Sequence, residues 1–509
     1  MIHLKRLLKK IFNRTTICVF GIVVQIGYFA SLCLGLGFCY NASYLVFQAL
    51  GVIVSMFIIN SDINSSYKIA WILVIMAFPI FGVMFYIFFG NSSSGRKLRR
   101  KMSPYIQAEK DMLSEDAQNG DIPENKPYSI TRQADYLRKS GFPAYCETNA
   151  VYLPSGEDKF KALLRELESA ESFIYLEYFI INEGKMWNSI LDILERKANS
   201  GVDVRLIYDD IGCLLTLPVK YEKELEKRGI KCRVFNKFKP FLTKKLNNRD
   251  HRKIFIIDGK TAFTGGINLA DEYINEFEKH GHWKDTAVML KGKAAHGFTV
   301  MFLTMWNYLS GENPKNYGCL TEYREEGAGF VVPFCDSPLD DEPVGENVYL
   351  NIINNARNYV YITTPYLVID DEMQNALTLA ARSGVDVRII TPHVPDKWFV
   401  HAVTRAHYRK LTSLGVKIYE YYPGFIHSKS FVCDDEIGVV GTINLDYRSL
   451  YLHFECAAWL CKTDCIADIK QDFFKTLEEC DEITYDDCLS VNVFVRALRL
   501  ILKLFSPLM

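Results

Sequence analysis

The chain has 509 residues, of which 49% are hydrophobic, and a formal net charge of −1 at pH 7. This length allows two or three domains, and the apolar content allows membrane-embedded sequence in addition to a globular core. The balanced charge gives no reason to expect a nucleic-acid partner, and the 14 cysteines do not form the paired CxxC motifs of a zinc site. We therefore expect no metal and no nucleic acid.

The N-terminal region, residues 1–91, contains three apolar stretches at roughly 16–38, 44–60 and 68–90. Each approaches the ~20 residues that a helix needs to cross a bilayer. Repeated long stretches differ from a single cleavable signal peptide, so they predict a retained anchor of two or three transmembrane helices. Basic residues flank both ends of the region, which favours two full crossings, one interfacial or re-entrant segment, and a cytoplasmic catalytic part.

The remaining chain contains an internal duplication. The hexapeptide SGVDVR occurs at 200–205 and again at 383–388, each time after a helix-like stretch and before a β-branched strand. A strand-like run precedes each copy, at Phe173–Ile181 and Tyr359–Ile369. Strand, helix and strand in succession imply a right-handed crossover, so we expect two α/β domains with largely parallel sheets.

The sequence past the second domain has the pattern of a helix. Arg496, Arg499 and Lys503 fall on one helical face, and apolar residues occupy much of the rest. Such a helix either lies on an anionic bilayer surface or docks onto the catalytic domain. The expected parts of the chain are a membrane anchor at 1–91, a linker at 92–135, the first α/β domain at 136–330, the second at 331–485, and this basic amphipathic helix at 486–509.

Each half of the duplication reaches the same string of polar residues. The strings are HRKIFIID, with His251, Lys253 and Asp258, and HSKSFVCD, with His427, Lys429 and Asp434. Alternate side chains of a strand share a face, so each His is expected beside its Lys. A glycine turn follows each string and ends in Asn268 or Asn444, whose amide can reach the same phosphate-sized space. One HxK alone is common on surface strands, but two at matching places predict a catalytic pair.

The pattern HxKx4D followed by GxxN, present twice, resembles the phospholipase D superfamily. The flanking sequences, among them NRDHRK at 248–253, NLDYRS at 444–449 and HFE at 453–455, are similar to those of bacterial cardiolipin synthases. The resemblance implies two phospholipase D-like α/β sandwich domains with pseudo-twofold symmetry, preceded by transmembrane helices in the bacterial cell membrane. Both motifs would then meet in one cleft.

The resemblance also implies a displacement in two steps without metal or cofactor. His251 would attack phosphorus to give a phosphatidyl-histidine, and His427 would protonate the departing alcohol, although the symmetry of the motifs leaves their order open. The phosphate oxygens would be held by Lys253, Lys429, Asn268 and Asn444.

Supporting acidic residues are expected downstream of each motif, because each His needs an acceptor for its second ring nitrogen. Glu455 is the candidate in the second half and Asp285 the candidate in the first. Asp258 and Asp434, at odd spacing from the motif Lys, are expected to support the fold rather than to touch phosphate. Arg249 and Arg252 flank the first motif and either meet a second lipid phosphate or lie in solvent.

The predicted function is that of a phosphatidyltransferase that joins two phosphatidylglycerol molecules into cardiolipin and releases glycerol. Its partners would be phosphatidylglycerol and anionic membrane lipids, and the sequence leaves the oligomeric state open. Water as acceptor would make the protein a phospholipase D, and serine would make it a phosphatidylserine synthase. The alternatives of another kind are a nuclease of the same superfamily and a non-catalytic, lipid-binding membrane scaffold.

Overall fold

A computed structural model describes residues 38–90, 93–119, 128–237, 248–318, 323–339 and 342–508, together with 22, 23, 25–27 and 30. The chain divides into two compact units. One contains the N-terminal helices up to Arg99 and the chain end from Leu500, and the other contains Arg100–Lys237 and Asn248–Arg499.

The described part of the first unit contains the apolar helices α3 (Phe38–Ile59), α4 (Ser65–Ala77) and α5 (Pro79–Phe85) and a π-helical turn η1 (Tyr86–Gly90). Ile58 of α3 packs with Trp71 and Ile75 of α4 and with Val83 of α5. Within the described residues, no helix combines the length and the apolar character needed to cross a bilayer. The expected transmembrane helices therefore find no support there.

The third apolar stretch is divided between two helices in the structure. It does not form one helix, because Phe78 leaves the helical region at φ −133° and ψ 72° and Pro79 starts a new helix. Proline disfavours helical backbone in the residue before it. The 13 residues of α4 span only about 20 Å at 1.5 Å per residue. The first stretch, 16–38, lies largely outside the described residues.

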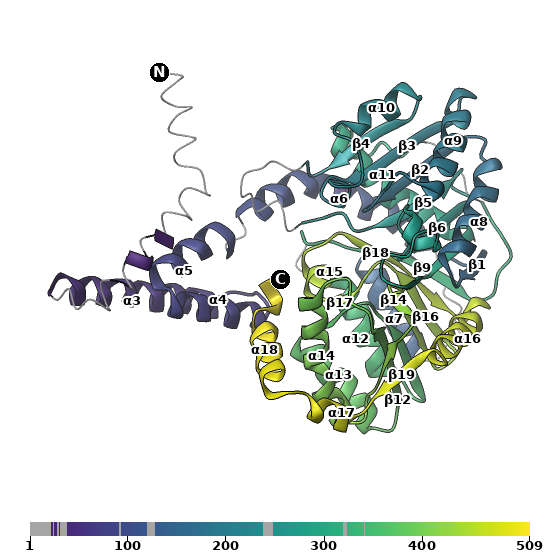
Figure 1. The fold of residues 1–509 in the computed structure, drawn as a ribbon. Coiled ribbons are helices and arrows are strands. Elements are labelled where there is room, and N and C mark those ends of the chain that lie inside the picture. The colour runs from purple at the N-terminus through teal and green to yellow at the C-terminus, as the bar shows by residue number, and fades with distance from the viewer. Residues whose placement is uncertain are drawn as a thin grey trace, which may run out of the picture. The chain divides into compact units, whose positions relative to one another are not determined.

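The second unit contains two large sheets (Figure 1). The order of strands in the first is β1-β8-β6-β5-β2-β3-β4. These strands are β1 (Thr148–Leu153), β2 (Phe173–Tyr178), β3 (Asp203–Asp209), β4 (Lys231–Phe235), β5 (Lys253–Ile257), β6 (Thr261–Gly265) and β8 (Ala287–Gly292). The helices of this half are α8 (Gly156–Glu168), α9 (Lys185–Asn199), α10 (Tyr221–Lys227) and α11 (Ala294–Ser310), with a 3-10 turn η3 (Asp271–Ile274).

The second sheet has the order β9-β18-β16-β15-β10-β12-β13-β19. Its strands are β9 (Phe330–Asp336), β10 (Tyr359–Thr363), β12 (Asp386–Pro392), β13 (Lys417–Tyr421), β15 (Ser430–Cys433), β16 (Ile437–Gly441), β18 (Glu455–Cys461) and β19 (Cys480–Ile483). Its helices are α12 (Val344–Asn355), α13 (Asp371–Arg382), α14 (Trp398–Ser413), α15 (Tyr447–Tyr451) and α16 (Cys465–Leu477). The first seven strands follow the order of the first sheet one for one, which confirms the duplication and the two α/β domains.

Smaller elements complete the chain. Two pairs of short strands lie outside the large sheets, β11 (Leu367–Val368) with β17 (Leu445–Asp446) and β7 (His282–Lys284) with β14 (Gly424–Ile426). The segment expected as a linker, 92–135, contains α6 (Ser93–Asn119) and the first part of α7 (Tyr128–Lys139). The C-terminal tail forms α17 (Tyr485–Ser490), α18 (Val493–Leu504) and a 3-10 turn η4 (Ser506–Leu508).

The expectation of largely parallel sheets was wrong. In each large sheet, as far as the structure describes it, only three neighbouring strands run parallel, β2-β3-β4 and β10-β12-β13, and the other pairings of these sheets are antiparallel. The crossover helices α9 and α13 make the parallel part, as the repeated hexapeptide predicted. The strands after each motif instead form hairpins, β5 with β6 and β15 with β16, because a tight turn joins them.

Aromatic stacking fixes the helices on opposite faces of the first sheet. On β2, Ile174 and Leu176 join the core beneath α8 and α9, whereas Tyr175 points the other way and stacks on Phe302 of α11 at 4.9 Å. The helix α11 also contacts β9 of the second sheet, and α16 likewise contacts β1 of the first (Figure 1). Each half thus covers part of the other.

The motif aspartates support the fold, as the sequence predicted. Asp258 and Asp434 occupy the hairpin turns with φ of 53° and 52°. Each carboxylate accepts three backbone N–H groups that start the neighbouring strand: Asp258 those of Glu171, Ser172 and Phe173, and Asp434 those of Arg357, Asn358 and Tyr359.

We expect Asp434→Asn to lower the free energy of unfolding by roughly 2–4 kcal/mol, because an amide replaces one acceptor by a donor that faces N–H groups. Asp435→Asn is the matched control, since Asp435 is exposed and pairs with Lys470 at the surface, where the loss should stay below about 1 kcal/mol. Thermal unfolding of both variants gives the comparison. Unchanged stability with abolished activity in Asp434→Asn would instead place this carboxylate at the substrate.

Candidate active site

The two motif histidines lie just before the central strands of the two sheets. His251 precedes β5, of which Lys253 is the first residue, and His427 follows β14 at the entry to β15. Each lysine is buried and donates its Nζ to the backbone carbonyl of its own motif His, at 2.8 Å for Lys253 and with a short contact for Lys429. The expected placement of each Lys beside its His is therefore observed.

The acidic partners of the histidines are exchanged between the halves. The Nδ1 of His251 lies 2.9 Å from both carboxylate oxygens of Glu455, and the Nδ1 of His427 lies 2.7 Å from Oδ2 of Asp285. The sequence correctly selected both acids, but the expectation that each serves the motif of its own half was wrong. Both acids are fully buried, and both histidines are less than a tenth exposed.

Backbone hydrogen bonds hold this exchange in register. The N–H of His251 donates to the carbonyl of Phe454 at 2.9 Å, and that of His427 donates to the carbonyl of Lys284 at 2.7 Å. Phe454 and Lys284 are the residues directly before the two acids. Each motif histidine therefore bonds two consecutive residues of the other half. Its backbone N–H bonds the first of these residues, and its ring bonds the acid that follows.

The second residue of each GxxN turn differs between the halves, and it fits the acid beside it. A Cβ on Gly266 would lie only 2.1 Å from Oδ1 of Asp285, so glycine leaves room for the shorter acid. Thr442 stands at the matching position in the second half and donates its hydroxyl to Glu455. The two sites are alike in plan but differ in their contacts.

The two His–carboxylate pairs bind protons differently. Burial lowers the pKa of His251 to about 3, although Glu455 opposes this shift. Burial opposes ionisation of Glu455, yet the charge of His251 and the hydrogen bond with it leave the pKa of the carboxyl below its usual range. In the other pair, burial raises the pKa of Asp285 to about 6, and burial with the charges of Lys429 and Lys253 lowers that of His427. Lys253 is among the charges that lower the pKa of His427, although it belongs to the motif of the other half.

Three buried lysines surround this site. Burial lowers the pKa of Lys253 to about 8 and that of Lys429 to about 7. The third, Lys159, was not predicted from the sequence; its Nζ donates to the hydroxyl of Tyr178 at 3.2 Å and to the carbonyl of Ile267 at 2.9 Å. The sequence did contain a signal for its burial. Lys159 stands four and eight residues before Leu163 and Leu167 of α8, which are buried, and residues four apart lie on the same face of a helix.

The two GxxN asparagines are buried but not equivalent. Asn268 accepts the N–H of Ile180 at 3.0 Å and donates to the hydroxyl of Tyr273 at 2.6 Å, so both ends of its amide are used within the protein. The Oδ1 of Asn444 has no hydrogen-bond partner among the residues that the structure describes. Of the two predicted phosphate contacts, Asn444 is therefore the less engaged.

The arginines beside the first motif bind carboxylates. Arg249 forms a buried bidentate pair with Asp209 at the end of β3, and Arg252 pairs with Glu177 of β2 and with Asp250. Both side chains are nearly fully buried. Neither expectation, solvent exposure or contact with a lipid phosphate, describes them.

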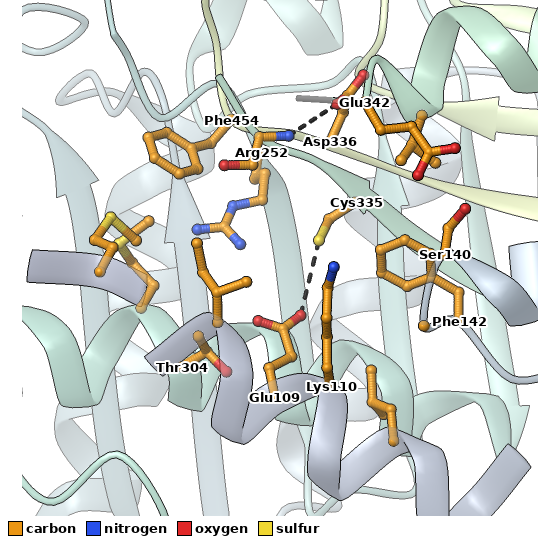
Figure 2. A pocket seen from close by; sticks show the side chains of 17 residues that line it. Glu109, Lys110, Ser140, Phe142, Arg252, Thr304, Cys335, Asp336, Glu342 and Phe454 are labelled. Carbon is orange, nitrogen blue, oxygen red and sulfur yellow. Dashed lines mark hydrogen bonds between the residues drawn. The ribbon is translucent and has the colours of Figure 1, made fainter. Parts of the chain in front are cut away.

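A separate pocket lies beside Arg252 and Phe454, and α6 forms part of its wall (Figure 2). Its space, including the part open to solvent, is ≈ 710 Å³, and neither motif histidine is among its lining residues. Within it, the Sγ of Cys335 points to Oε1 of Glu109 at 3.7 Å, and burial raises the pKa of Glu109. This pocket is distinct from the His–carboxylate pairs.

Comparisons with known proteins agree with this geometry. The family described as "Cardiolipin synthase, PLD-like domain" matches residues 163–306 and 349–477, and the family "Phospholipase_D-nuclease N-terminal" matches 49–91. A cardiolipin synthase of Alkalihalophilus pseudofirmus is 33% identical over 474 residues, covering 91% of this chain and 93% of that protein. One of Halalkalibacterium halodurans is 30% identical over 507 residues, covering 98% of this chain and 100% of that protein.

The crystal structure of a phosphatidylserine synthase of Haemophilus influenzae has the same fold. It superposes with a TM-score of 0.58 over 75% of this chain and 98% of that chain, at 16% sequence identity. At this identity the likeness concerns the fold alone.

We expect the buried Lys429 to destabilise the protein by an amount that depends on pH, and the variant Lys429→Met should reveal this dependence. Because its pKa is about 7 in the native protein against an ordinary 10.5, the native state binds this proton more weakly than the unfolded chain does. Wild-type stability should therefore rise with pH above about 7, by up to about 1.4 kcal/mol per pH unit. Lys429→Met lacks this contribution.

Chemical unfolding at pH 7, 8 and 9 provides the measurement: the stability of Lys429→Met relative to wild type should be most favourable at pH 7 and decline towards pH 9. Activity should fall by about a hundredfold or more, because a cation at the phosphate is lost. Lys410→Met, on the exposed side of α14, controls for removal of a surface charge. A relative stability that rises with pH would contradict the assignment.

Proposed function

This chain belongs to the cardiolipin synthase family with phospholipase D-like domains, and we propose that its two crossed His–carboxylate pairs carry a phosphatidyl group from one phosphatidylglycerol to another. The protein is a phosphatidyltransferase that acts on phospholipids. The observation that carries the mechanism is the presence of two histidines in one site, each hydrogen-bonded at Nδ1 to a buried acid of the other half.

The first step breaks the bond between phosphorus and the glycerol headgroup. With its Nδ1–H donated to Glu455, neutral His251 keeps a lone pair on Nε2, and this lone pair attacks phosphorus. The P–O bond to the headgroup glycerol breaks, and His427 gives a proton to the departing oxygen. The products are free glycerol and a phosphatidyl-histidine.

The second step reverses these roles with a new alcohol. His427, now neutral, takes the proton from a headgroup hydroxyl of a second phosphatidylglycerol while that oxygen attacks phosphorus. The P–N bond to His251 breaks and cardiolipin leaves. The two steps consume two phosphatidylglycerol molecules and give one cardiolipin and one glycerol, so atoms and protons balance.

The proton affinities support the order of the two histidines. Burial raises the pKa of the Asp285 carboxyl beside His427 to about 6, whereas the charge of His251 holds the pKa of the Glu455 carboxyl below its usual range. An anionic phosphate in the site would favour protonation of both pairs, and the His427 pair would respond first. His427 therefore suits the acid and His251 the nucleophile.

Cations and amides of the site suit the developing charge on phosphorus. Lys253 and Lys429 stand on either side of the interface, and both are held by carbonyls of the residues that they assist. Such fixed donors in a buried site stabilise a transition state without reorganisation. Only the Nδ2–H end of an asparagine amide can donate to a phosphate oxygen, so Asn268 and Asn444 would act through Nδ2.

We further propose that the protein works at the bacterial cell membrane, with its catalytic part on the cytoplasmic side. The apolar helices of residues 38–90 and the basic residues that flank them support this placement. The helix α18 presents Phe494, Leu498 and Ile501 exposed, which suits contact with a lipid surface.

Product analysis tests the proposal. Purified full-length protein in detergent micelles is incubated with labelled phosphatidylglycerol, and lipids and glycerol are resolved. Wild type should form cardiolipin and glycerol, and His251→Ala should lose at least about a thousandfold in rate, because the nucleophile is gone. His282→Asn, an exposed histidine outside the pairs, should retain most of the rate.

Each other outcome selects an alternative. Phosphatidic acid as the sole product would identify a phospholipase D, and phosphatidylserine formed on addition of serine would identify a phosphatidylserine synthase. Lipid binding without turnover of any phospholipid would leave a membrane scaffold.

The crossed pairing makes a second prediction about the intermediate. Glu455→Gln should reduce labelling of the enzyme by the phosphatidyl group about tenfold to a thousandfold, because it disturbs the tautomer of His251 although it lies 204 residues away. Asp285→Asn should instead impair the proton transfers of His427. Its labelled enzyme should persist longer after a chase with unlabelled phosphatidylglycerol.

The measurement is acid quenching followed by detection of label on the protein. Suppose instead that the label persisted in Glu455→Gln and that labelling fell in Asp285→Asn. Either each acid would then serve the histidine of its own half, or the roles of the two histidines would be exchanged. Labelling of His251→Ala but not of His427→Ala would select the exchange of roles.

A further inference from the structure

A third histidine stands beside the His251–Glu455 pair and has no part in the mechanism above. The ring centroid of His453 lies 5.6 Å from that of His251, and its Nδ1 lies 3.7 Å from Oε1 of Glu455. Its side chain is only 11% exposed. Both ring nitrogens are buried, and among the described residues neither has a partner within 3.5 Å, the approach of Nδ1 to Glu455 being longer than a normal hydrogen bond. Buried polar atoms normally have partners, so this pair of nitrogens needs an explanation.

The three side chains have the chemistry and spacing of a metal site. Among the described residues they are the one group of three such side chains whose ligand atoms all fall within 4.8 Å of one another. Ligands at the usual 2.0–2.1 Å from a tetrahedral zinc ion are about 3.3 Å apart. The separations from Glu455 Oε1, 2.9 Å to His251 and 3.7 Å to His453, bracket this value.

We propose that His251, His453 and Glu455 form a reversible inhibitory site for a divalent transition-metal ion of the zinc class. Two imidazoles and one carboxylate are a ligand set that zinc binds, with a fourth position left for water. Thr442 occupies Oε2 of Glu455 and leaves Oε1 facing both rings. His453 is the residue that turns a catalytic pair into a set of three ligands.

Bound metal stops the reaction in two ways. It takes Glu455 away from the Nδ1–H of His251, so the tautomer of the nucleophile is no longer fixed. It also withdraws electron density from the imidazole that must attack phosphorus. The inhibition rests on the proposed function, whereas the binding site does not.

Metal binding is tested directly with cobalt. Full-length protein, first freed of metal with chelator, is titrated with Co²⁺ in wild type, His453→Asn and the control His282→Asn. Wild type and the control should bind one ion per chain and show visible bands of nitrogen and oxygen ligation without a thiolate charge-transfer band. His453→Asn should lose this spectrum, because it retains only two of the three ligands.

Zinc inhibition is measured in parallel on cardiolipin formation, with the rate of each variant normalised to its own metal-free rate. The zinc concentration that halves the rate should be about tenfold higher or more in His453→Asn than in wild type, and unchanged in His282→Asn.

Equal zinc sensitivity of His453→Asn and wild type, or a thiolate band in wild type, would overturn the site. Cobalt binding at His453 without loss of activity on zinc addition would overturn the inhibition. If metal-free wild type formed no cardiolipin, the proposed function would fail, and the cobalt spectrum would still decide the site.

Discussion

The hydrogen bonds from His251 to Glu455 and from His427 to Asp285 determine the arrangement of everything around them. Each ties the segment just before a central strand of one half to an acid of the other half, and the neighbouring backbone bonds to Phe454 and Lys284 join the same segments. The ion pair of Lys284 with Asp472 and the hydroxyl contact between Thr286 and Ser428 close the interface further. The catalytic groups are thus placed by contacts between the halves, and the folding of a single half does not suffice.

The duplicated halves have kept their strand order while their site chemistry has diverged. The carbonyl of the GxxN isoleucine illustrates this: in the first half Lys159 donates to Ile267, whereas in the second the hydroxyl of Tyr349 donates to Ile443. A cation therefore stands in one half where a neutral group stands in the other. Such differences act on the acids of the site: the charge of Lys159 opposes the rise that burial causes in the pKa of Asp285.

The sequence predicted the duplication and the α/β class, because local spacing determines them. It did not predict which acid serves which histidine, since that depends on the packing of segments 142 and 204 residues apart. Lys159 and Arg252 were missed or misjudged because burial of a charge becomes recognisable only with its partners in place. The break at Phe78 escaped a count of apolar residues, although Pro79 signalled it.

The exchange of acids also constrains how this protein can change over generations. A half separated from its twin would carry a histidine whose ring has no acceptor and an acid with nothing to orient. Neither half is a complete ancestor of the present enzyme on its own, unless two identical copies once met in the same way. A substitution at Asp285 or Glu455 therefore affects a histidine that is encoded hundreds of bases away. Selection on either half depends on the sequence of the other.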